Sequence, residues 1–176
     1  VRMNDIIENV LQLSRQKPAL PTLLNIGKWL PKFMDDFQVS LPEKADIHCK
    51  IDPEDLQVRI DPSQLSQIIT NLSENGLRYS KQATNKMQLE LICGWTEDGQ
   101  HPYVDIIDKG LGVDKDQVEN LFEPFFTSET TGTGLGLYIA KELCESNQAR
   151  LNYIPVPTGG SCFRITFAHP GRIIAI

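Results

Sequence analysis

Apolar residues between positions 61 and 79 recur every three or four residues, which is the spacing of an amphipathic helix. They are Leu65, Ile68, Ile69, Leu72, Gly76 and Tyr79. Asp61 can cap such a helix and Pro62 suits its first turn, while Gln64 stands where a capping box has an amide or a carboxylate. We therefore expect a helix that starts at Asp61 and turns these apolar side chains toward a core.

A polar stripe accompanies the apolar one on the same helix. Asn71, Asn75 and Arg78 follow the same spacing, rotated by roughly 100° at 3.6 residues per turn. Solvated helix faces are normally built from Glu and Lys, whose helix propensity is better than that of Asn. The stripe is therefore a candidate binding site.

The pattern on either side of this helix predicts further helices and strands. A second helix is expected within 23–37, with Trp29, Leu30, Phe33 and Phe37 on its buried face, although Pro31 argues for a kink or a late start. The other expected elements are strands 45–51 and 56–60 joined by a turn at 52–55, strands 86–95 and 103–108, a short helix 114–121, a loop 122–133, a helix 134–146, and a closing hairpin of 149–154 with 161–167. This order predicts a mixed sheet with helices packed on one face.

The first residues carry a shorter repeat. Apolar residues follow an a/d spacing there: Met3, Ile6, Val10 and Leu13. The seam ends at Lys17, because the residue before Pro18 is pushed out of the helical region. Two interpretations stay open, a core helix of the same domain or the tail of a dimerising helical hairpin. The chain starts at Val1 without a Met inside this pattern, which indicates a piece of a longer protein.

Composition and charge narrow the class of protein. The 176 residues are 40% hydrophobic and 23% charged, which suits one domain with a sizeable core. A net charge of −6 argues against a surface for nucleic acid or anionic membrane. The sequence has no stretch of ~20 apolar residues and no signal-peptide pattern. The four cysteines (Cys49, Cys93, Cys144, Cys162) are widely spaced, which fits reduced thiols in a cytosol better than disulfides or zinc.

Three separate segments carry residues that suit one ligand. In the polar stripe, the Asn75 carboxamide oxygen is a neutral hard ligand for Mg²⁺, which keeps several waters and takes phosphate oxygens. Arg78 can pair with phosphate. The alternative for this segment is that the Asn side chains cap local backbone.

The second and third segments are rich in glycine. Asp108 follows a strand and can accept a hydrogen bond from an exocyclic amine, while Gly110 and Gly112 let a flat ring approach the backbone; the alternative is an Asx turn. The segment from Gly132 to Gly136 opens a helix, where free N–H groups and the helix dipole favour phosphate. It is neither a Walker loop nor a GxGxxG fingerprint, and its alternative is a glycine hinge.

Taken together and in this order, the segments resemble the ATP-binding domain of bacterial sensor histidine kinases, in the gyrase, Hsp90, histidine kinase and MutL superfamily. The resemblance covers about 20–168 and rests on NLSENGLRYS (N box), IIDKGLGV (first glycine box), LFEPFFTS (F box), TGTGLGLYIAKEL (second glycine box) and TGGSCFRITF (closing strand). It implies a two-layer α/β sandwich, the Bergerat fold, that binds ATP and Mg²⁺. GLYIAKELCESNQARLNY and FRITFAHPGR further resemble sensor kinases that control type IV pilus transcription.

The resemblance implies a role for each matched residue. Asn75 matches the metal ligand, Asn71 its phosphate-side neighbour, and Arg78 a phosphate contact that is often Lys in the family. Tyr79 matches a residue beside the nucleotide and Asp108 the adenine contact. The glycine segments supply the rest of the expected cofactor-binding set: Gly110 and Gly112 on the adenine side, and Gly132, Thr133, Gly134, Leu135 and Gly136 on the phosphate side. Gly76 departs from the family, which usually has Ala there, and should loosen the helix slightly.

The implied activity is that of a protein histidine kinase. ATPase members of the superfamily carry a Glu where this chain has Asn71, and an amide cannot take a proton from water, so we expect the γ-phosphate to pass to a presented histidine. That histidine is absent here: His48, His101 and His169 lie in strand or tail contexts and are expected to be structural. The alternatives are a non-catalytic nucleotide-binding regulatory module, an ATPase of the same superfamily, and a purely structural dimer.

Two smaller expectations concern the rim of the site. Glu74 lies on the far side of the polar stripe from the core, so we expect a solvated side chain rather than a catalytic base. The loop 122–133 is expected to act as a lid. Phe125 and Phe126 either dock this lid or pack in the core.

The expected organisation has three parts. Residues 1–17 are the C-terminal part of a dimerisation and phosphoacceptor hairpin, 20–170 the ATP-binding catalytic domain, and 171–176 a tail. The expected partners are ATP, the chain's own upstream hairpin, a second copy in the full-length protein and a response-regulator receiver domain, without nucleic acid or direct membrane contact. The expected location is the cytosolic side of a bacterial sensor anchored in the inner membrane.

Overall fold

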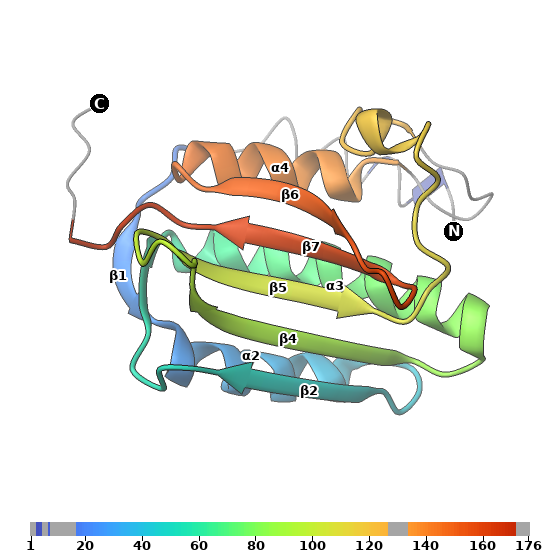
Figure 1. Ribbon diagram of the computed structural model, residues 1–176, viewed down its shortest axis with the longest axis horizontal. Coiled ribbons are helices and arrows are strands. Elements are labelled where there is room, and N and C mark those ends of the chain that lie inside the picture. The colour runs from blue at the N-terminus through green and yellow to red at the C-terminus, as the bar shows by residue number, and fades with distance from the viewer. Residues whose placement is uncertain (1–2, 5–6, 8–16, 127–133, 172–176) are drawn as a thin grey trace.

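A mixed five-stranded sheet carries three helices on one of its faces in the computed structural model, which describes residues 3–4, 7, 17–126 and 134–171 (Figure 1). The strand order is β2-β4-β5-β7-β6. The bounds are β2 Asp46–Ile51, β4 Gln88–Trp95, β5 Pro102–Asp108, β6 Arg150–Pro155 and β7 Ser161–Thr166. β2 runs parallel to β4 and the other neighbours are antiparallel. The predicted α/β sandwich with a mixed sheet is confirmed.

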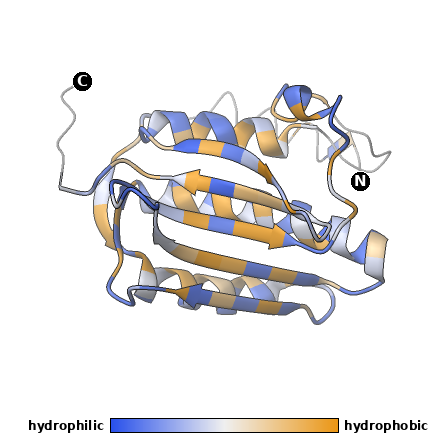
Figure 2. Ribbon diagram, in the orientation of Figure 1, coloured by the Kyte–Doolittle hydropathy of each residue, from blue (hydrophilic) through white to orange (hydrophobic). Residues whose placement is uncertain are grey.

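The helices are α2 (Ile26–Ser40), α3 (Pro62–Thr84) and α4 (Gly136–Ser146). The core lies between them and the sheet: Val104 and Ile106 of β5 face Leu65, Ile68 and other buried residues of the helix layer. Figure 2 shows hydrophobic residues along the central strands, with polar residues interspersed. Within the described part of the chain, no helix is both long and apolar enough to cross a bilayer.

Helix α3 starts as predicted, but its capping box is wrong. Asp61 caps the helix, since its Oδ1 accepts the backbone N–H groups of Ser63 and Gln64 at 3.0 and 3.3 Å. The Gln64 side chain does not return to the Asp61 amide. The end of α4 lies beside the start of α3 and brings Asn147 to that amide instead, at 2.9 Å.

Gly76 has a packing role that the sequence did not indicate. A Cβ atom at this position would lie 2.8 Å from Leu89 Cδ1 on β4 and 3.3 Å from Asp108 Cβ on β5. The missing side chain therefore lets α3 approach the ends of two central strands closely.

The expected second helix is present, with its start inside the range 23–37 and its end at Ser40, beyond that range. Residues 22–25 form a strand, β1 (Thr22–Asn25), which pairs antiparallel with β3 (Gln57–Ile60) in a separate two-stranded sheet. Helix α2 begins directly after it because Asn25 Oδ1 accepts the Lys28 amide at 3.1 Å. Pro31 lies inside this helix rather than at its start. Leu30 and Phe37 are buried as predicted, while Trp29 and Phe33 are half-buried and stack on each other.

The expected strands 45–51 and 56–60 are present as β2 and β3, and each pairs with another strand: β2 with β4, and β3 with β1. One further expectation fails. The expected helix 114–121 is reduced to one 3₁₀ turn, Val118–Asn120. Gly132 and Thr133, with most of the expected lid and most of 1–17, lie outside the described residues. The proposed domain boundaries therefore stay predictions.

Candidate nucleotide-binding site

The polar stripe of α3 is tied to the start of α4. Gln67 Nε2 donates to Asn71 Oδ1 at 2.7 Å, and Asn71 Nδ2 donates to the Gly136 carbonyl at 3.2 Å. Asn71 therefore links the first of the predicted site segments to the third. The Gln67 contact follows the i, i+4 spacing of a helix, although the sequence reading did not include it.

Asn75 is buried and half-satisfied. Its Oδ1 accepts a hydrogen bond from Arg78 Nη2 at 2.9 Å, and the Arg78 guanidinium lies 5.5 Å from the centroid of the Tyr79 ring. Among the described residues, the buried Asn75 Nδ2 group has no hydrogen-bond partner. A buried amide in this state costs free energy, so the position suits a ligand group that would satisfy it.

Asp108, at the end of β5, is likewise buried and half-satisfied, but its side chain is a carboxyl group that can carry charge. The residue is only 1% exposed, and its Oδ1 accepts the Gly110 amide at 2.8 Å. Its Oδ2 is buried and has no hydrogen-bond partner in the described part of the chain. Burial raises the pKa of Asp108 to about 6, although hydrogen bonds from the backbone of Gly110 and Ser161 oppose the rise.

The loop after β5 lies against α3. A Cβ atom on Gly76 would be 3.7 Å from Asp108 Oδ2, and one on Gly110 would be 2.8 Å from Tyr79 Cβ. The predicted adenine-side residues and the polar stripe are therefore neighbours. The structure thus brings together residues from α3, from the loop after β5 and from the start of α4.

A fourth segment, which the sequence reading did not assign to the site, closes this loop from the other side. Gly112 (φ 82°) and Gly160 (φ 89°) both adopt conformations that favour glycine. A side chain on Gly112 would lie 3.1 Å from the Gly160 carbonyl, and one on Gly160 would collide with the carbonyl of Asp108. The Gly-Gly pair before β7 was the signal that could have indicated this contact.

The start of α4 carries no side-chain cap at Leu135. Among the described residues, no neighbouring heavy atom lies within 4 Å of the Cβ position of Gly136. Gly134 (φ 74°) packs closely on the backbone of Phe125. The Leu135 side chain is fully buried in the core, so only its backbone can face a ligand. Phe125 is 61% exposed, and its N–H donates to the Gly134 carbonyl at 2.8 Å.

Other candidates lie outside this arrangement. Glu74 is exposed, as expected. His48 pairs with Asp46 at 2.7 Å, His101 Nδ1 contacts the Phe167 carbonyl at 2.9 Å, and His169 accepts a local amide at 3.0 Å. Each histidine thus contacts another group of the fold, His101 across the chain and the other two close in sequence.

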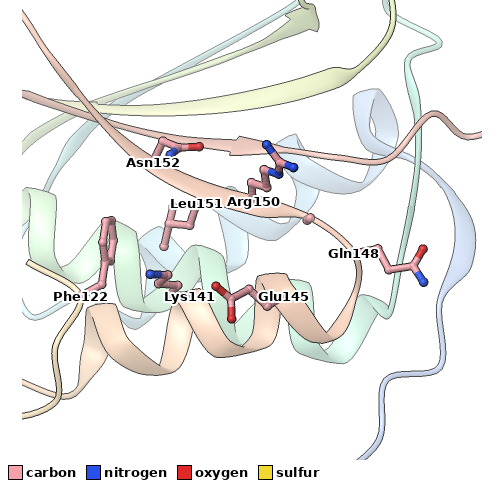
Figure 3. A pocket seen from close by; sticks show the side chains of 8 residues that line it. Phe122, Lys141, Glu145, Gln148, Arg150, Leu151 and Asn152 are labelled. Atoms are coloured by element: carbon pink, nitrogen blue, oxygen red, sulfur yellow. The ribbon is translucent and has the colours of Figure 1, made fainter. Parts of the chain in front are cut away.

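A groove of about 460 Å³ lies between α4 and the edge strand β6 (Figure 3). Its lining residues are Phe122, Lys141, Glu145, Gln148, Ala149, Arg150, Leu151 and Asn152. None of the predicted site residues is among them, so this groove is separate from the arrangement around Asp108.

An α/β sandwich with a buried, half-satisfied amide and carboxylate on adjoining elements has the build of a nucleotide-binding domain. The chain belongs to the histidine kinase-, DNA gyrase B-, and HSP90-like ATPase family, whose model matches residues 60–171. The resemblance to sensor histidine kinases that the sequence motifs indicated is therefore confirmed.

Individual proteins give the same result. The sensor protein kinase PilS of Pseudomonas aeruginosa is 49% identical over 172 residues, which are 98% of this chain and 32% of PilS. The chain thus spans about a third of that relative. In structure, it is similar to histidine kinase ThkA in complex with response regulator protein TrrA (TM-score 0.77, 19% identity, 98% of this chain and 49% of that one). It is also similar to full-length ShkA in complex with AMPPNP (TM-score 0.74, 21% identity, 95% and 36%).

Proposed function

We propose that this chain is the ATP-binding catalytic domain of a two-component sensor histidine kinase. It moves the γ-phosphate of ATP to a histidine on a helical hairpin outside this chain, and an aspartate of a response regulator then receives the phosphate. Family membership and the 49% identity to the sensor protein kinase PilS support this assignment.

One observation carries the proposal: two buried polar atoms that lack partners within the described residues, Asp108 Oδ2 and Asn75 Nδ2, lie on adjoining elements. Burying polar groups in this way is unfavourable in the absence of a ligand. In the proposed complex, Asp108 Oδ2 accepts a hydrogen bond from the exocyclic amine of adenine. The ring lies beside the loop of Gly110 and Gly112 in this proposal, and the two glycines let that loop pack against Tyr79 and Gly160.

The phosphates lie toward Asn71, Asn75 and the start of α4 in this proposal. A carbonyl oxygen has two lone pairs, so Asn75 Oδ1 can bind one cation while it accepts Arg78. In the described residues, no group of three or more His, Cys, Asp or Glu side chains is placed to hold a metal. A Mg²⁺ with one amide ligand, waters and phosphate oxygens fits this donor set. When bound, it would neutralise charge on the phosphates.

The residues near the phosphate end favour transfer over hydrolysis. Asn71 is an amide whose two ends already bond Gln67 and Gly136, and it cannot accept a proton from water. Glu74 is exposed and lies outside the stripe. The chain therefore holds ATP for a nucleophile that another segment presents.

The proposed partners follow from the same assignment. They are an upstream phosphoacceptor hairpin, a second copy of the full-length protein, and a receiver domain of the kind that the TrrA complex of ThkA contains. The identity to PilS and the motif resemblance support a role in type IV pilus transcription. We place the domain on the cytosolic side of an inner-membrane sensor.

The test has two stages. Calorimetric titration of the chain with a non-hydrolysable ATP analogue, with and without Mg²⁺, should show binding that Mg²⁺ strengthens. Adding radiolabelled ATP and a separately produced phosphoacceptor hairpin should then label the hairpin with acid-labile phosphate.

Each stage can contradict the proposal. The absence of nucleotide binding would support a purely structural dimer. Binding without label transfer would support a regulatory module, and rapid release of phosphate to water would support an ATPase. Acid-labile label on the chain itself would show that one of its own histidines is a phosphoacceptor.

A further inference from the structure

A second polar cluster lies where the start of α3 meets the end of α4. Its members are Asp61, Gln64 and Asn147, which are 8%, 8% and 4% exposed. Asn147 Oδ1 accepts the Asp61 amide at 2.9 Å, while Asn147 Nδ2 donates to Gln64 Oε1 at 2.7 Å and to the Leu143 carbonyl at 2.8 Å. The polar groups of the cluster thus satisfy one another.

Two hydrogen bonds lead from this cluster to the segment 17–21, which we call the linker. Gln64 Nε2 donates to the Lys17 carbonyl at 3.0 Å, and Asp61 Oδ2 accepts the Leu20 amide at 3.0 Å. The side chain of Leu20 is 74% exposed, and Lys17 and Pro18 are exposed as well. The linker is therefore held through its main chain.

The linker is also stiff. Pro18 and Pro21 fix their own φ angles and restrict the residues before them. Strand β1 begins at Thr22, directly after the linker. Thr22 pairs with Ile60, the residue that precedes Asp61, so the end of the linker is also held close to the cluster. A short segment with two prolines and two anchored backbone groups has little freedom to reorient.

The same two helices carry the candidate nucleotide site at their other meeting point. Asn71 lies seven residues after Gln64 on α3, which is about two helical turns or ~10 Å. Asn71 contacts Gly136 at the start of α4, and Asn147 directly follows the end of α4. The antiparallel pair of helices therefore fixes the position of the linker relative to the phosphate side of the candidate site.

We propose that Gln64, Asn147 and Asp61 are positioning residues for phosphoryl transfer within one protein. By anchoring the linker, they set where the upstream phosphoacceptor segment stands relative to the γ-phosphate. This inference rests on the proposed kinase function. The cluster does not touch the nucleotide, so its contribution is to transfer in cis and not to ATP binding.

A small displacement is enough for a large effect. Phosphoryl transfer depends on the position of the nucleophile, and an error of about 1 Å from a distant change can reduce a rate by roughly 100-fold. Releasing the linker at one of its two anchors is expected to produce part of that loss.

The test compares two substitutions at one linker position. Leu20→Pro removes the N–H group that Asp61 accepts, whereas Leu20→Ala removes a similar amount of exposed side chain and keeps that N–H. Gln64→Met, which is nearly isosteric, removes the bond to Lys17 from the other side. Each variant is made in the full-length protein with its own hairpin, and in this chain with the hairpin added separately.

Leu20→Pro and Gln64→Met should lower the cis transfer rate by about tenfold or more. The KM for ATP and the transfer rate to a separate hairpin should stay within about twofold of wild type, because the linker plays no part in trans. Leu20→Ala should match wild type in both settings.

Three results would overturn the inference. Equal cis rates in Leu20→Pro and Leu20→Ala would show that the anchor is unimportant. A parallel loss of trans transfer or of ATP affinity in the anchor variants would show damage to the nucleotide site. A wild-type protein that binds ATP but transfers phosphate in neither setting would refute the kinase function itself.

Discussion

Two groups of buried polar side chains, one at the candidate site and one where α3 meets the end of α4, are in opposite states. At the candidate site, Asn75 Nδ2 and Asp108 Oδ2 are buried without partners among the described residues. About three helical turns before Asn75, the side-chain polar groups of Asp61, Gln64 and Asn147 are buried and satisfied by one another and by the linker.

We interpret the unsatisfied groups as part of the proposed ligand site and the satisfied cluster as a structural contact of the fold. A satisfied cluster contributes to stability without any added molecule. Unsatisfied buried atoms reduce stability until a ligand supplies the missing bond. Substitutions at the two places should therefore have opposite signatures, one in nucleotide affinity and the other in the free energy of unfolding.

Asp108→Asn should have the largest effect on affinity. The amide oxygen must stay on the Gly110 N–H, so the NH₂ group replaces Oδ2 and opposes the adenine amine. We expect a loss of about 100-fold in affinity for an ATP analogue, without a loss of stability at pH 7, measured by calorimetry and urea unfolding. Asp105→Asn, in the same strand, breaks the pair with Arg164 instead and should keep the affinity. Unchanged affinity in Asp108→Asn would contradict the adenine contact.

Asn147→Ala should give the opposite signature. It leaves the Asp61 amide and Gln64 Oε1 unpaired in a buried place, so the free energy of unfolding should fall by about 2 kcal/mol. The nucleotide affinity of the folded protein should remain within about twofold. Asn152→Ala on β6 is an exposed control and should cost less than about 0.5 kcal/mol in urea unfolding. If Asn147→Ala lowered the free energy of unfolding as little as Asn152→Ala does, the contrast between the two groups of side chains would be refuted.

Asn75→Ala tests the proposed Mg²⁺ ligand of the candidate nucleotide site. The variant should bind the ATP analogue about tenfold more weakly with Mg²⁺ and lose less affinity without it, because the metal bond is lost only in the first case and the contact of Nδ2 is lost in both. The measurement is the difference between titrations with Mg²⁺ and with EDTA. Gln82→Ala, on an exposed position of the same helix, is the control. An equal loss in both buffers would remove Asn75 from metal binding.

The pH dependence of affinity gives the smallest expected effect. With its pKa raised to about 6, Asp108 is mostly ionised at pH 7.5 and mostly protonated at pH 5.5. If the carboxylate is the form that binds, affinity should be about fourfold weaker at pH 5.5, beyond any change that Asp108→Asn also shows. The variant corrects for titration of the nucleotide phosphates. Identical pH profiles in the two proteins would exclude this role.

The same pKa predicts the pH dependence of stability, with the opposite direction. A carboxyl whose pKa is raised on folding binds more protons in the folded state between about pH 4 and 6. Its contribution is therefore most favourable below pH 4 and is lost as the pH rises through about 6, by up to about 3 kcal/mol. Urea unfolding of wild type and Asp108→Asn at pH 4.5 and 7.5 should converge at the lower pH. Parallel curves would contradict the shift.

The sequence predicted helix α3 well, because its cap and its period are local properties. Asp61, Pro62 and the apolar stripe each act within one or two turns. Strand β1 could not be predicted in this way, since its four residues are extended only because they pair with β3, far along the chain. The same holds for the pairing of β2, which depends on β4 and not on the neighbouring turn.

The candidate site residues were predicted from side-chain chemistry and motif resemblance, whereas contacts of the backbone were not predicted. Asp108 and Asn75 stand out because a carboxylate after a strand and amides on a helix are unusual choices. Gly160 belongs to a turn that any hairpin can use, and its contact with the Asp108 carbonyl depends on the order of strands in the sheet. The role of Asn147 could not be read either, because its partners lie more than 80 positions away.

Because the linker is held by hydrogen bonds to its main chain, its sequence can be exchanged when such proteins are recombined. Since the two anchoring bonds involve a carbonyl and an amide, almost any residue can occupy positions 17 and 20 without altering them. The linker thus tolerates many side chains, while the course of its backbone is fixed. A foreign sensory half spliced in at this point would inherit the geometry of the native connection, which makes the segment a natural crossover for chimeras.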